Sequence, residues 1–154
     1  SNTMYINIWA SGESRSDSLC GWAFLMECEG RVVENKGGAS YLLGLPLSKS
    51  VVNLIPIIEA LSLIKDKKRK IRIWHADSYT RNTLIEKWPS RWKEATKEKM
   101  GPAYLWDMWM KFEEEMDIEV MDLPEDGITY DLALIQEKAA IALVEDYYSS
   151  NTPS

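Results

Sequence analysis

The side chains best suited to binding a phosphate lie in one short part of the sequence. Trp88 and Trp92 are four positions apart, and basic side chains flank them at Lys87, Arg91 and Lys93. Lysine and arginine contact phosphate oxygens through their charge, with an affinity that falls as the salt concentration rises. The cluster therefore predicts a contact with a nucleic-acid backbone. The alternative is that both tryptophans only pack this segment against the rest of the protein.

The distribution of charge favours such a contact more than the net charge does. The 154-residue chain has 18 basic and 24 acidic residues, and its net charge of −6 argues against a polyanionic partner. Residues 65–99, called the basic segment below, hold 12 basic and five acidic residues and carry +7, whereas the remainder carries −13. Such asymmetry indicates nucleic-acid contact, and a merely solvated basic surface is the alternative.

The one histidine and the two cysteines are predicted to be structural. His75 precedes Asp77 by two positions, which places both on the same face of a strand. A lone histidine there is more often a core or supporting residue than a metal ligand. Cys20 and Cys28 would lie about 26 Å apart on a strand that rises about 3.3 Å per residue, too far for a disulfide. We expect free thiols, as in a reducing cytoplasm.

Length and composition indicate one globular domain. A hydrophobic fraction of 45% is sufficient for a core. We expect a single domain over residues 4–148, a disordered tail over residues 149–154, and a cloning remnant at residues 1–3, before the first methionine. No apolar run approaches the roughly 20 residues of a membrane span, and the first residues lack the layout of a secretory signal. These features predict a cytoplasmic location.

Apolar periodicity predicts the elements that position these residues. Strands are expected at residues 5–9, 20–28, 31–35, 71–76 and 118–121, and helices at residues 50–64, 78–88, 91–99, 104–116 and 130–147. Ser48 or Ser50 would cap the first helix, and Pro56 would kink it or set its start. Short connections make the first three strands antiparallel, and helical crossovers make the last two parallel to a neighbour. The predicted fold class is α/β, a mixed five-stranded sheet flanked by helices.

Several motifs follow one another along the chain in a recognisable order. Gly21-Trp22 follows Ala10 by 11 residues, and Trp88 follows Asp77-Ser78 by 11 residues counted from the aspartate. VNLIPIIEALSLI, RWKEATKEKMGPAYLWDMW and YDLALIQEKAAIA complete the series. In this order and at these spacings, nearly the whole chain resembles ribonuclease H of the bacterial type, which carries a basic, tryptophan-bearing handle. The resemblance implies a ribonuclease H-like fold.

The resemblance also implies a chemistry, hydrolysis of the RNA strand of an RNA–DNA hybrid by two Mg²⁺ ions about 3.5–4 Å apart. The family binds these ions with four carboxylates, and the matching positions here are Ala10, Asn53, Asp77 and Asp131. Only Asp77 and Asp131 can serve as charged metal ligands, because a methyl group binds no cation and an amide is neutral. Each lost carboxylate charge is worth about 4 kcal/mol at ~4 Å from a cation in an effective dielectric near 20. The loss of two carboxylates would therefore lower the affinity for Mg²⁺ by several powers of ten.

We therefore expect a degenerate active site, weak or absent Mg²⁺ binding, and a ribonuclease H-type endonuclease that is impaired or inactive. The resemblance assigns nucleic-acid binding to the handle and to two serines near positions that hold a DNA phosphate; the set is Trp88, Trp92, Lys87, Arg91, Lys93, Ser48 and Ser78. The family's histidine in the loop before the last helix has no counterpart in DLPEDGITY.

Three alternatives stay open. Glu13, Glu125 or Asp126 would replace a missing ligand if its loop swung inward. An engineered aspartate-to-alanine change at Ala10 would leave a genuine Mg²⁺-dependent ribonuclease H that has been disarmed. The third is a protein-interaction module that reuses the fold, because residues 100–154 hold two basic and 13 acidic residues, a surface that repels phosphate and suits a basic protein partner.

Overall fold

A computed structural model describes residues 5–15, 18–41 and 48–151. Its five strands are β1 (Tyr5–Ser14), β2 (Leu19–Cys28), β3 (Arg31–Tyr41), β4 (Lys70–His75) and β5 (Asp117–Val120). They form one sheet in the order β3-β2-β1-β4-β5. The pairs β1–β2 and β2–β3 are antiparallel, whereas β1–β4 and β4–β5 are parallel. The predicted mixed sheet is confirmed.

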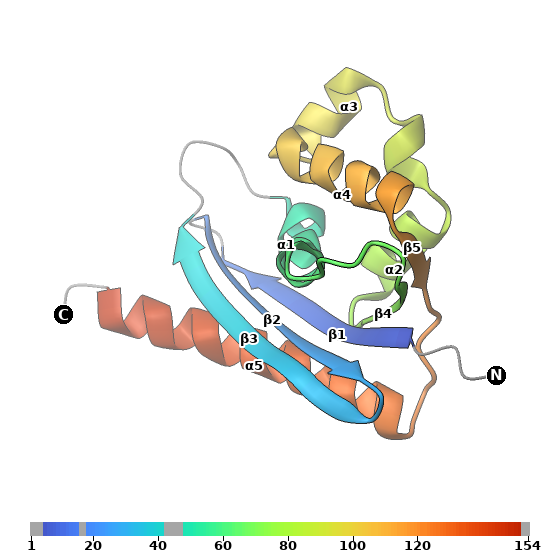
Figure 1. Ribbon diagram of the computed structural model, residues 1–154. Coiled ribbons are helices and arrows are strands. Elements are labelled where there is room, and N and C mark those ends of the chain that lie inside the picture. The colour runs from blue at the N-terminus through green and yellow to red at the C-terminus, as the bar shows by residue number, and fades with distance from the viewer. Residues whose placement is uncertain (1–4, 16–17, 42–47, 152–154) are drawn as a thin grey trace.

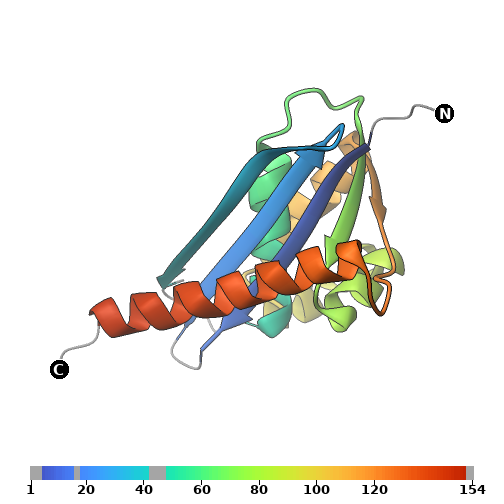
Figure 2. The ribbon, with the colours of Figure 1, turned by 90° about the horizontal axis from the view of Figure 1, so that it is seen from below.

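Helices cover both faces of this sheet (Figure 1). They are α1 (Lys49–Ser62), α2 (Ser78–Ile85), the 3-10 helix η1 (Trp88–Arg91), α3 (Glu94–Lys99), α4 (Ala103–Glu115) and α5 (Ile128–Asn151). α1 and α4 lie on one face, and α5 crosses the other face over β1, β2 and β3 (Figure 2). None of the helices in the described part of the chain has the length and apolar character to cross a membrane.

Some elements are longer than their local sequence predicts. β1 continues past its expected end at residue 9 to Ser14, because it pairs with β2 as far as Cys20. β3 likewise continues past its expected end at residue 35, through Gly37 and Gly38 to Tyr41. α5 runs to Asn151, so residues 149–151 of the expected tail are helical. Residues 1–3, the expected cloning remnant, and residues 152–154 of the expected tail lie outside the described residues.

The sheet separates two groups of buried side chains. On the α1 side, Ile6, Ile8 and Ala10 of β1 join a large core that includes Trp106 and Trp109 of α4. On the α5 side, Trp9 packs in a smaller cluster around Ala133. This alternation is the period of two expected of a strand buried on both faces. Cys20 and Cys28 lie at opposite ends of β2 and are free, as expected.

α1 approaches β1 through main-chain atoms. Ser48 caps the helix, since its Oγ accepts a hydrogen bond from the Val51 amide at 3.1 Å, so Pro56 lies inside the helix and does not start it. Proline has no N–H to donate to the carbonyl of Val52, four residues earlier. That carbonyl oxygen faces β1, where a Cβ on Gly12 would lie only 2.5 Å from it. A glycine is therefore needed at this contact.

Candidate functional site

The end of β1, the first turns of α1 and the end of β4 meet at the positions that the resemblance assigns to metal ligands. Ala10 pairs with His75 across the parallel β1–β4 ladder, and its carbonyl oxygen accepts a hydrogen bond from the Ala76 amide at 3.1 Å. The side chain of Ala10 is 0% exposed and belongs to the core on the α1 side. Asn53, on α1, is 2% exposed. Asn53 is linked to the neighbours of Ala10, because it bonds Gly12 of β1 and its carbonyl oxygen bonds His75 of β4.

Both polar atoms of the Asn53 amide are bound to main chain. Oδ1 accepts a hydrogen bond from the Gly12 N–H at 3.0 Å, and Nδ2 donates to the carbonyl oxygen of Lys49 at 3.2 Å. Leaving a buried partner without its hydrogen bond costs about 1–3 kcal/mol. The amide oxygen therefore holds β1 against α1, and a rotation of the amide toward a cation would break this hydrogen bond.

His75 links the same elements from the other side. Its Nδ1 accepts a hydrogen bond from the Asp77 N–H at 2.9 Å, so Nε2 carries the proton and donates to the carbonyl oxygen of Asn53 at 2.8 Å. The ring is 0% exposed. Burial lowers the pKa of His75 to about 4, and this outweighs the opposing effects of the Asn53 hydrogen bond and the Asp77 charge. The imidazole is neutral at pH 7 and acts as a core residue, as expected.

Asp77 begins α2 as its N-terminal cap. Its Oδ2 accepts hydrogen bonds from the Thr80 N–H at 2.9 Å and from the Thr80 hydroxyl at 2.7 Å. Such a cap stabilises a helix by about 1 kcal/mol. Arg81, one turn along, donates to the carbonyl oxygen of His75 at 2.6 Å and brings a positive charge to this side. One oxygen of Asp77, Oδ1, accepts no hydrogen bond from any residue that the structure describes.

Asp131 lies in the first turn of α5, on the opposite face of the sheet from Asn53. Its side chain is exposed, but Leu132 and Ala133 pack in the cluster that contains Trp74 and Ala76, next to Asp77. The first turn of α5 and the end of β4 are thus neighbours. Over the described ranges, however, no three histidine, cysteine, aspartate or glutamate side chains are grouped so that they could hold a metal ion.

The three residues considered as replacement ligands do not change this picture. Glu13 bonds locally, because its Oε1 accepts a hydrogen bond from the Ser14 N–H at 3.2 Å. Glu125 and Asp126 are exposed in the loop before α5. The possible ligands at this place are therefore the Asn53 amide, which makes two hydrogen bonds, the neutral His75 imidazole and the Asp77 carboxylate, which caps α2. This set does not fit a pair of Mg²⁺ ions, which need several charged oxygen ligands, and we derive no chemical step through them.

The handle segment (residues 87–99) forms a second candidate site. Trp88, Arg91 and Trp92 line an open pocket of about 240 Å³. Trp92 meets the buried Trp106 edge to face, with ring centroids 5.0 Å apart, whereas Trp88 meets the exposed Tyr79 at 6.0 Å. Both tryptophans remain partly exposed while they pack against the body. The two tryptophans can therefore pack the handle segment against the body and still present a surface to a ligand.

The basic segment does not form a single surface. Its first part precedes β4 and its last part follows α2, and the six residues of β4 separate the two by about 16 Å at ~3.3 Å per step. Several of its charges are also paired within the molecule. Lys67 bonds Glu115 at 2.6 Å, and Lys97 bonds Glu94 at 2.9 Å. The side-chain ammonium groups of Lys93 and Lys99 make no hydrogen bond or ion pair with any residue that the structure describes.

The two serines assigned to a phosphate differ in their surroundings. Ser48 is committed twice, because its Oγ accepts from the Val51 N–H and donates to the carbonyl oxygen of Met100 at 2.9 Å. It thereby connects α1 to the end of the handle segment. Ser78 is exposed at the first position of α2, beside Asp77. Only Ser78 presents a hydroxyl that no described residue engages.

Sequence reasoning missed the residues that join these elements. Gly12 was not singled out, although it supplies both the close approach to Val52 and the N–H that Asn53 accepts. The sequence did contain one signal, Pro56, three residues after Asn53 in a buried helix. A proline inside a helix leaves a carbonyl oxygen of the preceding turn without its helical partner, so that oxygen can face another element. His75 is 22 residues from Asn53, and the residues around it give no sign that its ring bonds the Asn53 carbonyl oxygen.

Comparison with known proteins identifies the fold. Neither the scan of protein-family models nor the search of curated protein sequences finds a match. Among solved structures, the chain is similar to the N-terminal ribonuclease H domain of a Mycobacterium tuberculosis protein (TM-score 0.65, 14% identity), with 96% of this chain and 98% of that chain covered. It is also similar to ribonuclease H1 of the halophilic archaeon Halobacterium salinarum (TM-score 0.67, 12% identity, 92% and 98% covered).

A third similar structure is LC11 ribonuclease H1, solved in complex with an RNA/DNA hybrid (TM-score 0.57, 12% identity), with 92% of this chain and 98% of that chain covered. Identities this low establish a common architecture. The chain has a ribonuclease H-like fold, and the expectation drawn from its motifs is confirmed.

Proposed function

We propose that this protein binds RNA–DNA hybrid or another duplex through its handle segment, and that it has little or no hydrolytic activity. The observation that carries the proposal is the open pocket between Trp88, Arg91 and Trp92, in which two apolar rings flank an exposed arginine whose Nη2 donates to the Glu86 carbonyl oxygen at 2.6 Å. A similar structure binds an RNA/DNA hybrid, which supports a nucleic-acid partner for this fold.

Charge at the handle segment supports backbone contact. The ammonium groups of Lys93 and Lys99 have no partner among the described residues, and Lys87 reaches Glu113 only at 3.8 Å with its side chain 66% exposed. Exposed pairs at such a distance contribute little, so a phosphate competes easily for Lys87. Because these contacts are made to phosphates, they would position a duplex without reading its sequence.

The proposed loss of hydrolysis rests on the first site. Asn53 uses both ends of its amide within the fold, and the Ala10 side chain is enclosed by the core. Asp77 and Asp131 together bring a charge of −2 against the +4 of two Mg²⁺ ions. A site with that balance has little affinity for a second ion, and two-metal hydrolysis needs both.

A salt titration with a labelled hybrid tests the binding proposal. We expect fluorescence anisotropy to give a dissociation constant that rises steeply with salt. Replacing Lys93 or Arg91 by alanine should make the slope of log K against log[salt] shallower by about 0.9 per lost phosphate contact, the value for B-DNA. Lys138→Ala on α5 is the charge-matched control and should leave the slope unchanged. Absence of binding at low salt would overturn the proposal.

Cleavage assays with Mg²⁺ and with Mn²⁺ test the inactivity. Turnover comparable to that of a four-carboxylate enzyme would refute it. The same assay on Ala10→Asp addresses an engineered change at this position. If activity returned by many orders of magnitude, the protein would be a disarmed ribonuclease H whose Asn53 is tolerated. We expect no such recovery, because the Asn53 amide oxygen stays bonded to Gly12.

One observation favours a second candidate function, a protein-interaction module. Ile128 and Ile135 are two turns apart on the outer side of α5 and are 78% and 55% exposed. Asp131 lies between them, and the surrounding C-terminal part is acidic. This surface suits a partner with an apolar strip and basic flanks. If the hybrid does not bind at low salt, this function becomes the better account.

A further inference from the structure

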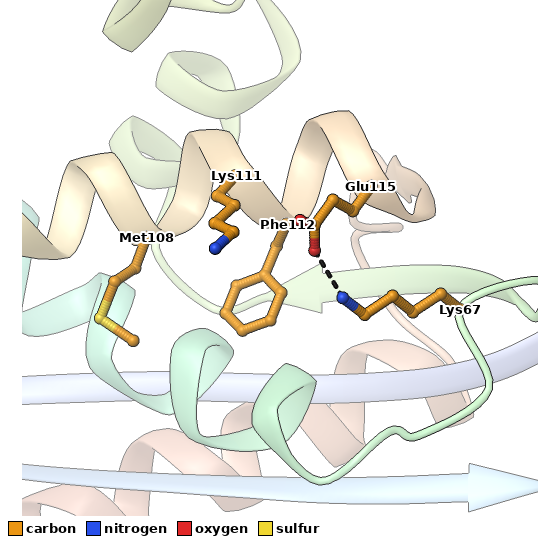
Figure 3. Close-up of a pocket in the computed structure, with 5 residues that line it drawn as sticks. All are labelled: Lys67, Met108, Lys111, Phe112 and Glu115. Atoms are coloured by element: carbon orange, nitrogen blue, oxygen red, sulfur yellow. Dashed lines mark hydrogen bonds and ion pairs between the residues drawn. The ribbon is translucent and has the colours of Figure 1, made fainter.

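A second pocket lies on the side of α4 that faces the α1–β4 connection, away from both sites described above. It has a volume of about 300 Å³ and is lined by four residues of α4 and one residue of the connection, namely Met108, Lys111, Phe112, Glu115 and Lys67 (Figure 3). A pocket of this size is at the lower end of the range for small-molecule sites.

The inner wall of this pocket is apolar. Met108 and Phe112 are four residues apart, so their side chains share one face of α4. Phe112 is partly buried and packs against the core, whereas Met108 remains 38% exposed. In Figure 3 both side chains point from α4 into the same space. An exposed methionine beside an aromatic ring forms an adaptable surface for a flat or short apolar group.

The rim of the pocket is charged and unbalanced. Lys67 and Glu115 close one end with an ion pair of 2.6 Å, and this hydrogen bond lowers the pKa of the Glu115 carboxyl below its ordinary value. The side chain of Lys111 makes no hydrogen bond or ion pair with any described residue, although its charge also acts on Glu115, and its ammonium group points into the pocket between Met108 and Phe112 (Figure 3). Two cations and one anion leave a net charge of +1.

We propose that this pocket binds a small amphipathic carboxylate. The apolar body of the ligand, about ten non-hydrogen atoms for this volume, would lie on Met108 and Phe112. Its single carboxylate would receive a charge-assisted hydrogen bond from the Lys111 ammonium. Glu115 makes the site selective for a single negative charge, because a second one would face its carboxylate.

Three probes with equal numbers of non-hydrogen atoms separate the contributions, and amide chemical shifts of the labelled protein report binding. The probes are 3-phenylpropionate, its neutral amide, and phenyl phosphate, which is mostly a dianion at neutral pH. We expect shifts confined to α4 and the α1–β4 connection, and the carboxylate should bind about tenfold more tightly than the amide. Phenyl phosphate should bind more weakly than the carboxylate.

Lys111→Met retains the length of the side chain and removes its charge. We expect this variant to bind the acid and the amide equally, while Lys138→Met, a matched change on α5, keeps the tenfold preference. Equal binding of the acid and the amide to the unaltered protein would overturn the proposal, and so would a preference that persists in Lys111→Met. Tighter binding of phenyl phosphate would identify a phosphate site instead. None of these outcomes depends on whether the handle segment binds a hybrid.

Discussion

Protonation of His75 should destabilise the fold as the pH falls from about 6.5 to about 4. The ring is fully buried and both of its nitrogens are engaged by main chain, with Nε2 donating and Nδ1 accepting. A second proton must go to Nδ1, which would then face the Asp77 N–H as donor against donor. The folded protein therefore resists a proton that the unfolded chain accepts readily.

The size of the effect follows from the two pKa values. The pKa is lowered to about 4 in the folded state and lies near 6.5 in an unfolded chain. In the interval between them the unfolded state binds more protons, so the free energy of unfolding falls as the pH falls, by at most about 1.4 kcal/mol per unit. The contribution of His75 is complete above pH ~6.5. About 3 kcal/mol of it is lost by pH ~4.

Urea unfolding at a series of pH values measures this loss, and His75→Gln removes the titrating group. Because carboxylates also titrate near pH 4, the quantity of interest is the difference between the two proteins. The unaltered protein should lose about 3 kcal/mol more than the variant between pH 7 and pH 4. The sequence has one histidine, so its ring resonances in an NMR titration are unambiguous. A difference of zero, or a ring that titrates near pH 6.5 in the folded protein, would refute the reasoning.

Three further tests, made with five substitutions, address contacts around the two candidate sites, each through the urea midpoint. Gly12→Ala should destabilise the protein by about 1–3 kcal/mol, because its Cβ would meet a main-chain carbonyl at 2.5 Å. Gly30→Ala is the control: its Cβ would meet nothing within 4 Å, so any loss of stability there comes from the positive φ of Gly30 alone. An equal loss in both variants would contradict the contact at Gly12. Asn53→Asp should cost about 2–3 kcal/mol, since it turns a buried donor toward Lys49 into an anion; added Mg²⁺ should not recover that loss, and recovery would mean that a metal site forms. Trp92→Ala should cost about 2 kcal/mol or more and Trp88→Ala less than 1, because only Trp92 packs on a buried ring; the reverse order would show that Trp88 is the anchor.

Local periodicity predicted most of the architecture because each segment carried its own signal. Val51, Leu54 and Ile58 recur at helical spacing, and Ser48 stands where a cap is needed, so α1 was predicted to within two residues at each end. The polar residues at the end of β1 gave no such signal. They are extended because β2 pairs with them, and pairing partners are not encoded in the strand itself.

The first candidate site was located by the sequence but its bonding was not. The resemblance placed Asn53 and Ala10 in one site, and in the structure Asn53 bonds Gly12, two residues after Ala10. The direction of the amide depends on an N–H 41 residues away in Gly12, and no property of α1 alone reveals it. Likewise, the charge count could not show that β4 divides the basic segment, because counting charges along a chain ignores the length of the strand between them.

The contacts between α1 and its neighbours have a bearing on how this sequence can diverge. Three hydrogen bonds at this place each join a side chain to a peptide group: the Asn53 amide to Gly12, the His75 ring to Asn53, and the same ring to Asp77. Every residue has a peptide group, so the exposed residues of α1 can be substituted without changing how the helix packs on β1 and β4. This kind of contact therefore tolerates substitutions at the positions other than Gly12 that contribute only main-chain atoms. Among homologues of this protein, we expect the asparagine, the glycine and the histidine to be kept or lost together.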